Sequence, residues 1–189
     1  MTDAAVPLAV ERVEAFGGRD LDELCEAAET AILDGGGFGW LKPPPRAILE
    51  RFWKGVLLVP ERELFVARVD GVVGGSAQLV RPARNNEAQA FAATLTAHFV
   101  APWARGRGLA RRLVAAVEEH ARKAGFHVLA LDVRETQTAA VALYESMGFV
   151  RWGTNPHYAM VENRMVAGHY YTKVLKVLPP RTRPKGETA

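Results

Sequence analysis

The spacing of apolar residues changes several times along the chain, and each change marks an expected element of secondary structure. Apolar side chains recur at helical spacing over Asp20–Leu33, and a short apolar strand precedes them at Leu8–Phe16. The three prolines at 43–45 fix the backbone and lead into a second helix through Ala47–Trp53. The first quarter of the chain therefore predicts one strand and two helices.

Three strands are expected next. Glu63–Val69 and Val72–Val80 are rich in β-branched and apolar residues, and the dipeptide Asp70-Gly71 between them is a strong hairpin signal. Ala88–Val100 extends this antiparallel set by a third strand.

The period then becomes helical between Gly108 and Gly125, where glycine ends the helix. A short apolar strand at His127–Val133 follows, and Thr138–Met147 forms another helix. A strand, a crossover helix and a second strand predict a unit with parallel strands.

The last expected strands are Phe149–Trp152 and Tyr170–Val177, joined by a polar and aromatic connection at Gly153–His169. This order of elements predicts an α/β fold with one mixed sheet. Residues 179–189 are proline-rich and basic and lack apolar periodicity, which predicts a disordered tail behind a single domain at 1–178.

Composition narrows the class of protein further. The 189 residues are 49% hydrophobic and 24% charged, with a formal net charge of +3, so nothing in the charge balance calls for nucleic acid. One cysteine, Cys25, excludes a disulfide framework and a cysteine zinc cluster. No apolar run reaches the roughly 20 residues of a membrane helix, and an acid at Asp3 is unlike a signal peptide. We therefore expect a cytoplasmic protein without a membrane partner.

The candidate chemistry lies where the strand ending at Val100 turns into the next helix. The turn contains Arg105-Gly106-Arg107-Gly108-Leu109-Ala110. Backbone N–H groups at a glycine turn and at a helix start can bind an anion, and a diphosphate fits best. The alternative is a tight turn that needs glycine for a positive φ, with two solvated arginines.

Two motifs make a family resemblance specific. Arg105-x-x-Gly108-x-Ala110 resembles the pyrophosphate motif of the GCN5-related N-acetyltransferases (GNAT), and Leu143-Tyr144-x-x-x-Gly148-Phe149 resembles that family's helix-to-strand signature. The resemblance implies a single domain with a central, mostly antiparallel, splayed sheet flanked by helices. It also implies an N-acetyltransferase that uses acetyl-CoA, with the pyrophosphate held by the turn residues Arg105, Gly106, Arg107, Gly108, Leu109 and Ala110.

The resemblance assigns further cofactor contacts. In such enzymes the strand before the turn splays from its neighbour, and the freed backbone binds the pantetheine arm, which here implicates Phe99 and Val100. Gln137 stands where the family often has an asparagine that touches the cofactor, and it carries the same donor and acceptor on a longer stem.

By the same resemblance, Tyr144 is the general acid that protonates the departing thiolate. A phenol with a pKa near about 10 keeps its proton at neutral pH and can donate it to a thiolate, whose pKa is near about 8.5. The alternative is a buried aromatic whose hydroxyl is merely hydrogen-bonded.

The general base is left open by the sequence. The strand before the turn contains no carboxylate, and the period of two places Thr94, Thr96 and His98 on one face. His98 could accept the amine proton directly or through water, or it could simply donate to a nearby carbonyl.

The acceptor site is expected at the loop between the first two helices and at the connection between the last two strands, with Trp40, His157 and Tyr158 as its contacts. Gly153–Tyr171 holds one acid and one arginine among neutral and aromatic residues, which favours a small amine, a metabolite or toxin, as in the tabtoxin-resistance-type acetyltransferases that the chain resembles more weakly. A peptide N-acetyltransferase and a catalytically silent acyl-CoA-binding module are the alternatives.

No metal is expected, because no two of the five histidines stand four residues apart. A homodimer is left open.

Overall fold

A computed structural model describes residues 6–36, 38–177 and 179–180. Within them one mixed sheet has the strand order β1-β2-β3-β4-β5-β7-β6. Its strands are β1 (Leu8–Val13), β2 (Arg62–Val69), β3 (Val72–Val80), β4 (Ala92–Val100), β5 (Val128–Arg134), β6 (Val150–Val161) and β7 (Arg164–Val174). Among these strands β4 and β5 form the parallel pair and the others pair antiparallel, as expected. The tail predicted at 179–189 lies largely outside the described residues.

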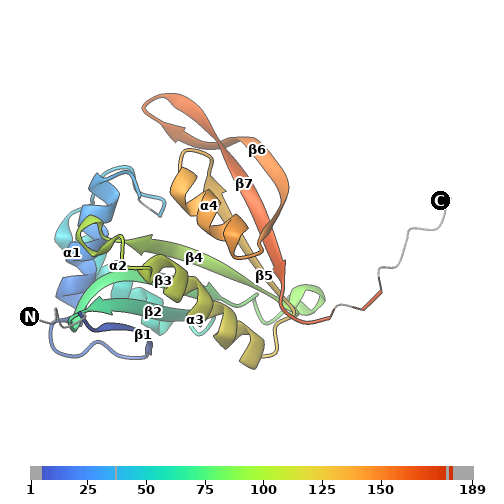
Figure 1. The fold of residues 1–189 in the computed structure, drawn as a ribbon, viewed down its shortest axis with the longest axis horizontal. Coiled ribbons are helices and arrows are strands. Elements are labelled where there is room, and N and C mark those ends of the chain that lie inside the picture. Colours follow the sequence, from blue (N-terminus) through green and yellow to red (C-terminus); the bar gives the residue numbers. More distant parts are fainter. Residues whose placement is uncertain (1–5, 37, 178, 181–189) are drawn as a thin grey trace, which may run out of the picture.

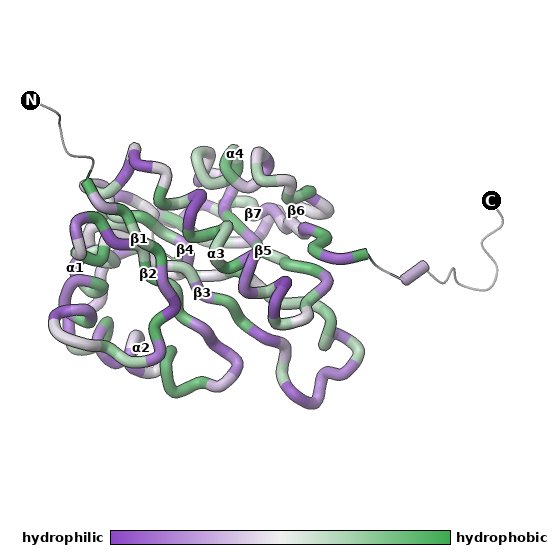
Figure 2. Tube along the Cα trace, turned by 60° about the horizontal axis from the view of Figure 1, so that its bottom comes forward, coloured by the Kyte–Doolittle hydropathy of each residue, from purple (hydrophilic) through white to green (hydrophobic). Residues whose placement is uncertain are grey.

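Helices cover both faces of the sheet (Figure 1). They are α1 (Asp20–Leu33), α2 (Arg46–Leu58), α3 (Leu109–Lys123) and α4 (Thr138–Ser146). Two short 3₁₀ turns lie at Glu87–Gln89 and Pro102–Ala104. In Figure 2 hydrophilic and hydrophobic residues alternate along the helices, as they do in amphipathic helices that bury one side. No helix in the described part is long and apolar enough to cross a membrane.

The core consists of two clusters separated by the sheet. Leu113 and Val117 of α3 pack against Phe65 and Leu79 on one face. On the other face α1 and α2 bury a second set, in which Trp53 is completely inaccessible. The helices predicted at Asp20–Leu33 and from Gly108 to Gly125 are confirmed by this packing.

The hairpin predicted at Asp70-Gly71 is also confirmed. Asp70 and Gly71 have φ values of 51° and 81°, the left-handed conformations that a tight two-residue β-turn requires. The strand predicted from Ala88 starts later, at Ala92, because Glu87–Gln89 forms a 3₁₀ turn instead.

The end of the chain differs most from the prediction. The segment Gly153–His169 is not a connection, because β6 and β7 run almost without interruption through it and form a long hairpin. The strands turn at Glu162 and Asn163, which have φ values of 48° and 59°. No glycine marks this turn, so the polar composition of the strands hid a second hairpin.

The sheet opens between β4 and β5. These parallel strands pair only over Ala92–Thr94 and Val128–Ala130. Figure 1 shows that they lie together at one end and separate toward the other, where α4 follows β5. The predicted splay is therefore confirmed, and the backbone of β4 beyond Thr94 is not paired to β5.

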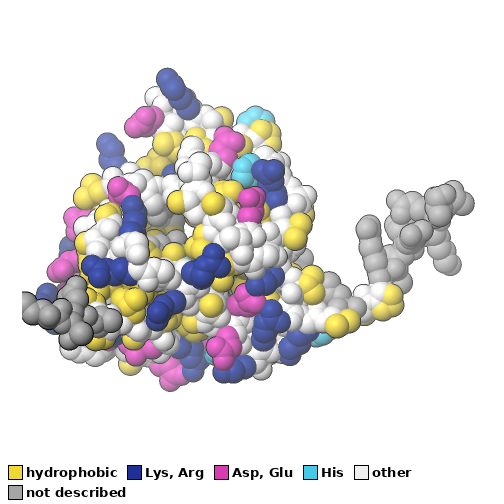
Figure 3. Space-filling view, viewed as in Figure 1, with side chains coloured by type: hydrophobic (Ala, Val, Ile, Leu, Met, Phe, Trp, Pro, Cys, Tyr) yellow, Lys and Arg dark blue, Asp and Glu magenta, His cyan; other side chains and the backbone are white. Residues whose placement is uncertain are grey.

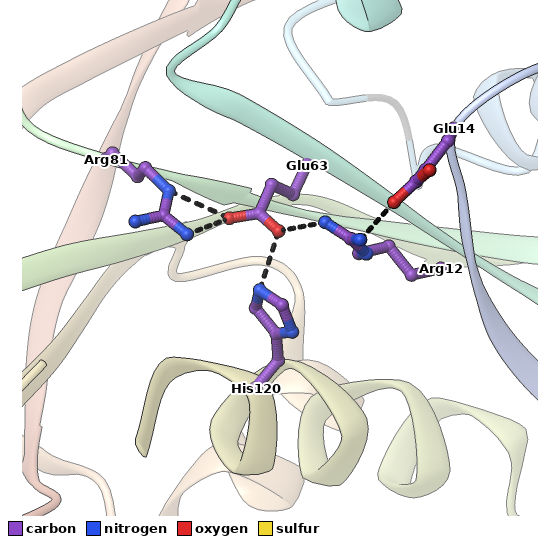
Figure 4. A network of polar contacts seen from close by, with 5 residues as sticks. All are labelled: Arg12, Glu14, Glu63, Arg81 and His120. Atoms are coloured by element: carbon purple, nitrogen blue, oxygen red, sulfur yellow. Dashed lines mark hydrogen bonds and ion pairs between the residues drawn. The ribbon is translucent and has the colours of Figure 1, made fainter. Parts of the chain in front are cut away.

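A charged cluster joins β1, β2 and the residue that follows β3 to α3 (Figure 4). Glu63 is 9% exposed and accepts hydrogen bonds from Arg12 (2.8 Å) and Arg81 (2.6 Å), while His120 Nε2 approaches its carboxylate to 2.6 Å. Burial by itself would raise the pKa of Glu63, but the hydrogen bonds from Arg81 and Arg12 outweigh it, and the pKa is lowered.

We expect Glu63→Gln to lower the free energy of unfolding by about 1–2 kcal/mol at pH 7, because Arg12 and Arg81 lose their carboxylate while staying partly solvated. The ionised carboxylate stabilises the fold above its ordinary pKa of about 4.3, and this contribution disappears as the pH falls through the lower pKa of the folded state.

Urea unfolding of wild type and Glu63→Gln at pH 7 and near pH 3 measures the loss of stability and its dependence on pH. Glu29→Gln, an exposed change on α1, serves as the control. A difference between wild type and Glu63→Gln that stays constant across this pH range would contradict the assignment.

Candidate functional site

The turn between β4 and α3 has the conformation of an anion-binding loop. Gly106 and Gly108 have φ values of 75° and 76°, and Gly108 is the N-cap residue of α3, with no side chain capping the helix. An added Cβ at either glycine would meet no atom within 4 Å. The glycines are therefore required by the backbone conformation and not by close packing. Because no side chain caps α3, its first N–H groups have no side-chain partner at the N-cap.

Positive charge surrounds this turn. Arg105, Arg107, Arg111 and Arg112 are exposed. Figure 3 shows basic side chains gathered around the start of α3. The partial positive charge of the helix N-terminus adds to them, so the surface attracts anions.

Two of the predicted cofactor residues contact the end of α1. Arg105 pairs with Asp34 at 2.5 Å and donates through Nε to the carbonyl of Val100 at 3.2 Å. Gln137 donates to the carbonyl of Gly35 at 2.8 Å. Asp34–Gly36 therefore reaches from the glycine turn to the start of α4.

A groove of about 470 Å³ runs from the turn into the split between β4 and β5. Its lining includes Phe99, Val100, Arg105, Ala110 and Gln137. All five are residues that the resemblance assigns to the cofactor, and the structure brings them together.

A second cavity of about 540 Å³ lies beside the groove. Gly36, His98, Gln137 and Ala140 line both spaces. The cavity is thus continuous with the deep end of the groove, and a molecule in one could meet a molecule in the other at His98.

Tyr144 lines the cavity and is hydrogen-bonded to His98, one of the residues at this junction. The Tyr144 hydroxyl is 2.8 Å from His98 Nδ1, and His98 Nε2 is 3.2 Å from the carbonyl oxygen of Ala110. Because a carbonyl can only accept, Nε2 carries the proton and Nδ1 accepts from the tyrosine. A chain of hydrogen bonds therefore links α4, β4 and the first turn of α3.

Burial sets the charge of both groups. It lowers the pKa of His98 to about 4, because the carbonyl of Ala110 offsets only part of the desolvation. Burial, reinforced by the charge of Asp132, raises the pKa of Tyr144 above its ordinary value. At neutral pH the imidazole is uncharged and the phenol keeps its proton.

A β-bulge explains why His98 reaches Tyr144. Between β3 and β4 the pairs Ser76–Phe99 and Gln78–Thr96 leave two residues of β4, Ala97 and His98, opposite one residue of β3. Ala97 has a φ of 47°. The bulge breaks the strict alternation along β4, so the shared face predicted for Thr94, Thr96 and His98 is wrong, and His98 contacts α3 and α4.

Sequence reasoning missed Asp132. This carboxylate lines the cavity with Tyr144 and accepts a hydrogen bond from the hydroxyl of Tyr158 on β6. Its signal in the sequence is a single acid at the end of an apolar strand, and it lies on β5 rather than on the strand before the glycine turn, where a base was expected. Burial and the bond to Asp132 raise the pKa of Tyr158.

The three residues predicted to contact the acceptor do not lie together in the structure. Tyr158 lines the cavity. Trp40 packs edge-on against Phe38 and Phe52 in the core under α2, and it does not line the cavity. His157 is exposed on β6, outside the lining.

The requirements of a metal site are not met in the described part of the chain. Those residues include no group of three or more histidine, cysteine, aspartate or glutamate side chains that could hold a metal ion.

Comparison with known proteins gives a consistent result. Residues 22–149 match the model of the Acetyltransferase (GNAT) family. An uncharacterized N-acetyltransferase encoded between hisH and hisA in Azospirillum brasilense is 66% identical over 72% of this chain and 79% of its own length.

Solved structures agree in fold. A GCN5-related N-acetyltransferase from Kribbella flavida has a TM-score of 0.72 with 26% identity, covering 88% of this chain and 97% of its own. YncA from Salmonella typhimurium, solved with its cofactor acetyl-CoA, has a TM-score of 0.71 with 19% identity, covering 89% and 94%.

The bonding of His98 can be measured directly. We expect its imidazole to remain neutral, as the Nε2–H tautomer, from pH 8 down to about pH 5, because burial opposes protonation until the pH approaches about 4. Long-range ¹H–¹⁵N spectra of the histidine side chains report this state, with His98→Asn identifying the signal. Protonation of His98 near pH 6.5 would contradict the assignment.

Proposed function

The chain belongs to the GNAT family of acetyltransferases, and from this premise we propose that it transfers the acetyl group of acetyl-CoA to the amine of a small molecule by direct attack. One observation carries the proposal. The Tyr144 hydroxyl lies in the cavity and bonds His98, which lines both the cavity and the groove behind the glycine turn, so a thioester and an amine could meet beside a proton donor.

The residues of the turn fit a diphosphate. The turn leads into α3, whose N-terminus has no side-chain cap, and Arg105 and Arg107 add charge. Arg105 must exchange Asp34 for the phosphate, and the β4 backbone beyond Thr94 can bond the pantetheine amides.

Starting from the neutral amine, the reaction needs a bond made, a bond broken and two proton transfers; an ammonium acceptor first gives one proton to solvent. The amine nitrogen forms a bond to the acetyl carbon, the carbon–sulfur bond breaks, an amine proton passes to a base and the thiolate takes a proton from Tyr144, which is reprotonated from solvent. The amide and free CoA leave. Tyr144 suits this role because it holds its proton at neutral pH.

Asp132 is the base that the geometry favours. It lines the same cavity as Tyr144, on the acceptor side, and Tyr158 fixes one of its oxygens. His98 suits the role less well, because one ring nitrogen accepts from Tyr144 and the other donates to Ala110. We assign His98 to positioning the Tyr144 hydroxyl, which must turn its one proton from His98 Nδ1 to the sulfur in order to donate it.

The cavity favours a small acceptor over a protein surface. Phe38 and Leu41 from one side and Tyr158 and Met160 from the other surround a space of about 540 Å³. This is the size of a site for a small molecule. A catalytically silent binding module would need neither the second cavity nor the carboxylate in it.

Replacing Gly108 by valine should weaken acetyl-CoA binding at least tenfold, about 1.4 kcal/mol, because a branched side chain at a φ of 76° distorts the anion-binding turn. Calorimetric titration measures the effect. Gly125→Val is the matched control, since Gly125 has a φ of 94° at the opposite end of the same helix. Equal losses in both variants would mean that the turn does not bind the cofactor.

Tyr144→Phe should lower kcat by about 10²–10⁴ while the dissociation constant of acetyl-CoA changes little, because only the acid is removed. Tyr171→Phe controls for the loss of a tyrosine hydroxyl. The Tyr171 hydroxyl donates a hydrogen bond of 2.9 Å to Glu145, and Tyr171 does not line the cavity. Release of free CoA with an active amine is the assay. Full turnover in Tyr144→Phe would assign the residue to packing.

A further inference from the structure

We propose that the acceptor carries a carboxylate close to its amine, as a free amino acid or an acidic analogue of one does, and that Arg134 recognises this carboxylate. The inference rests on the proposed function and names the class of acceptor. It arises from the charges that line the cavity.

The cavity wall offers one charge of each sign. Among the described residues that line it, Asp132 and Arg134 are the acidic and the basic side chain, and the remainder are apolar or uncharged at neutral pH. A cavity with one carboxylate and one guanidinium is complementary to a molecule with one ammonium and one carboxylate. A simple amine would leave the guanidinium facing an uncharged group.

The two charges have a fixed spacing. Asp132 and Arg134 are alternate residues of β5 and therefore lie on the same face, with their Cα atoms about 6.6 Å apart. Both project away from the core face, where Leu131 and Val133 are buried. Two flexible side chains from neighbouring points can reach both ends of one small zwitterion.

Asp132 is the side chain that faces the amine of the acceptor. It lines the same cavity as Tyr144, the proposed acid, and accepts a hydrogen bond from Tyr158. Arg134 faces the carboxylate of the acceptor, and it also donates to the carbonyl of Gly35 at 3.1 Å. A guanidinium has five N–H donors in a planar fork and can hold this carbonyl and a carboxylate together.

The rest of the lining leaves room for an apolar substituent. Phe38, Leu41 and Met160 line the cavity as well. The structure therefore favours amino acids with an apolar side chain. The N-terminus of a peptide fits less well, because its first carbonyl belongs to an uncharged amide.

Matched acceptors test the charge directly. Methionine, methioninamide and 3-(methylthio)propylamine share a side chain and an amine but differ in the carboxylate, and phenylalanine, phenylalaninamide and phenethylamine form a second set. We expect kcat/KM for the free acids to exceed that of the amides and amines at least tenfold in a CoA-release assay. The amide has the less basic amine, so chemical reactivity alone would favour it.

Variants then assign the preference to a residue. Arg134→Gln should remove the preference by raising KM for the acids at least tenfold with little change in kcat, and Arg134→Lys should restore part of it. Arg51→Gln, an exposed change on α2, should leave the preference intact. Acetyl-CoA affinity is measured in parallel to show that the variants remain folded and loaded.

Two results would overturn the inference while leaving the proposed function standing: equal kcat/KM for acid, amide and amine in the wild type, or an unchanged preference in Arg134→Gln. Absence of CoA release with every member of both sets, despite bound acetyl-CoA, would contradict the inference and the proposed transfer to small amines together.

Discussion

The short parallel pairing of β4 with β5 is the constraint on which the site depends. Three residue pairs hold the strands together, and beyond Thr94 they diverge. Divergence leaves a groove with unpaired backbone on one side and makes room for the cavity that Asp132 enters from β5. A fully paired sheet would satisfy these backbone groups internally and close both spaces.

Burial, as well as hydrogen bonding, determines the state of the polar groups at the split between β4 and β5. The chain from Tyr144 through His98 to the carbonyl of Ala110 crosses three elements, and desolvation keeps its members uncharged. The bulge at Ala97 is what brings His98 into that chain. A local irregularity of one strand thus couples the proposed acid to the helix that begins at the glycine turn.

The sequence located the glycine turn and the order of the early elements, because short-range signals specify them: glycines with positive φ, helical periodicity and a two-residue turn. Tyr144 was singled out by the resemblance to the GNAT helix-to-strand signature. Sequence reasoning missed the long β6–β7 hairpin, whose turn at Glu162 and Asn163 has no glycine, and the bulge, which follows from pairing between strands. Asp132 was missed for a related reason. Only the folded sheet brings the end of β5 beside Tyr144.

The most direct test of the account is a crystal structure of the chain with acetyl-CoA. We predict that the diphosphate lies on the amides of 106–110, with Arg105 released from Asp34, and that the thioester sulfur lies about 3–3.5 Å from the Tyr144 hydroxyl oxygen. The acetyl carbon should face the cavity that contains Asp132. A sulfur remote from Tyr144, or a diphosphate bound away from the glycine turn, would contradict the account.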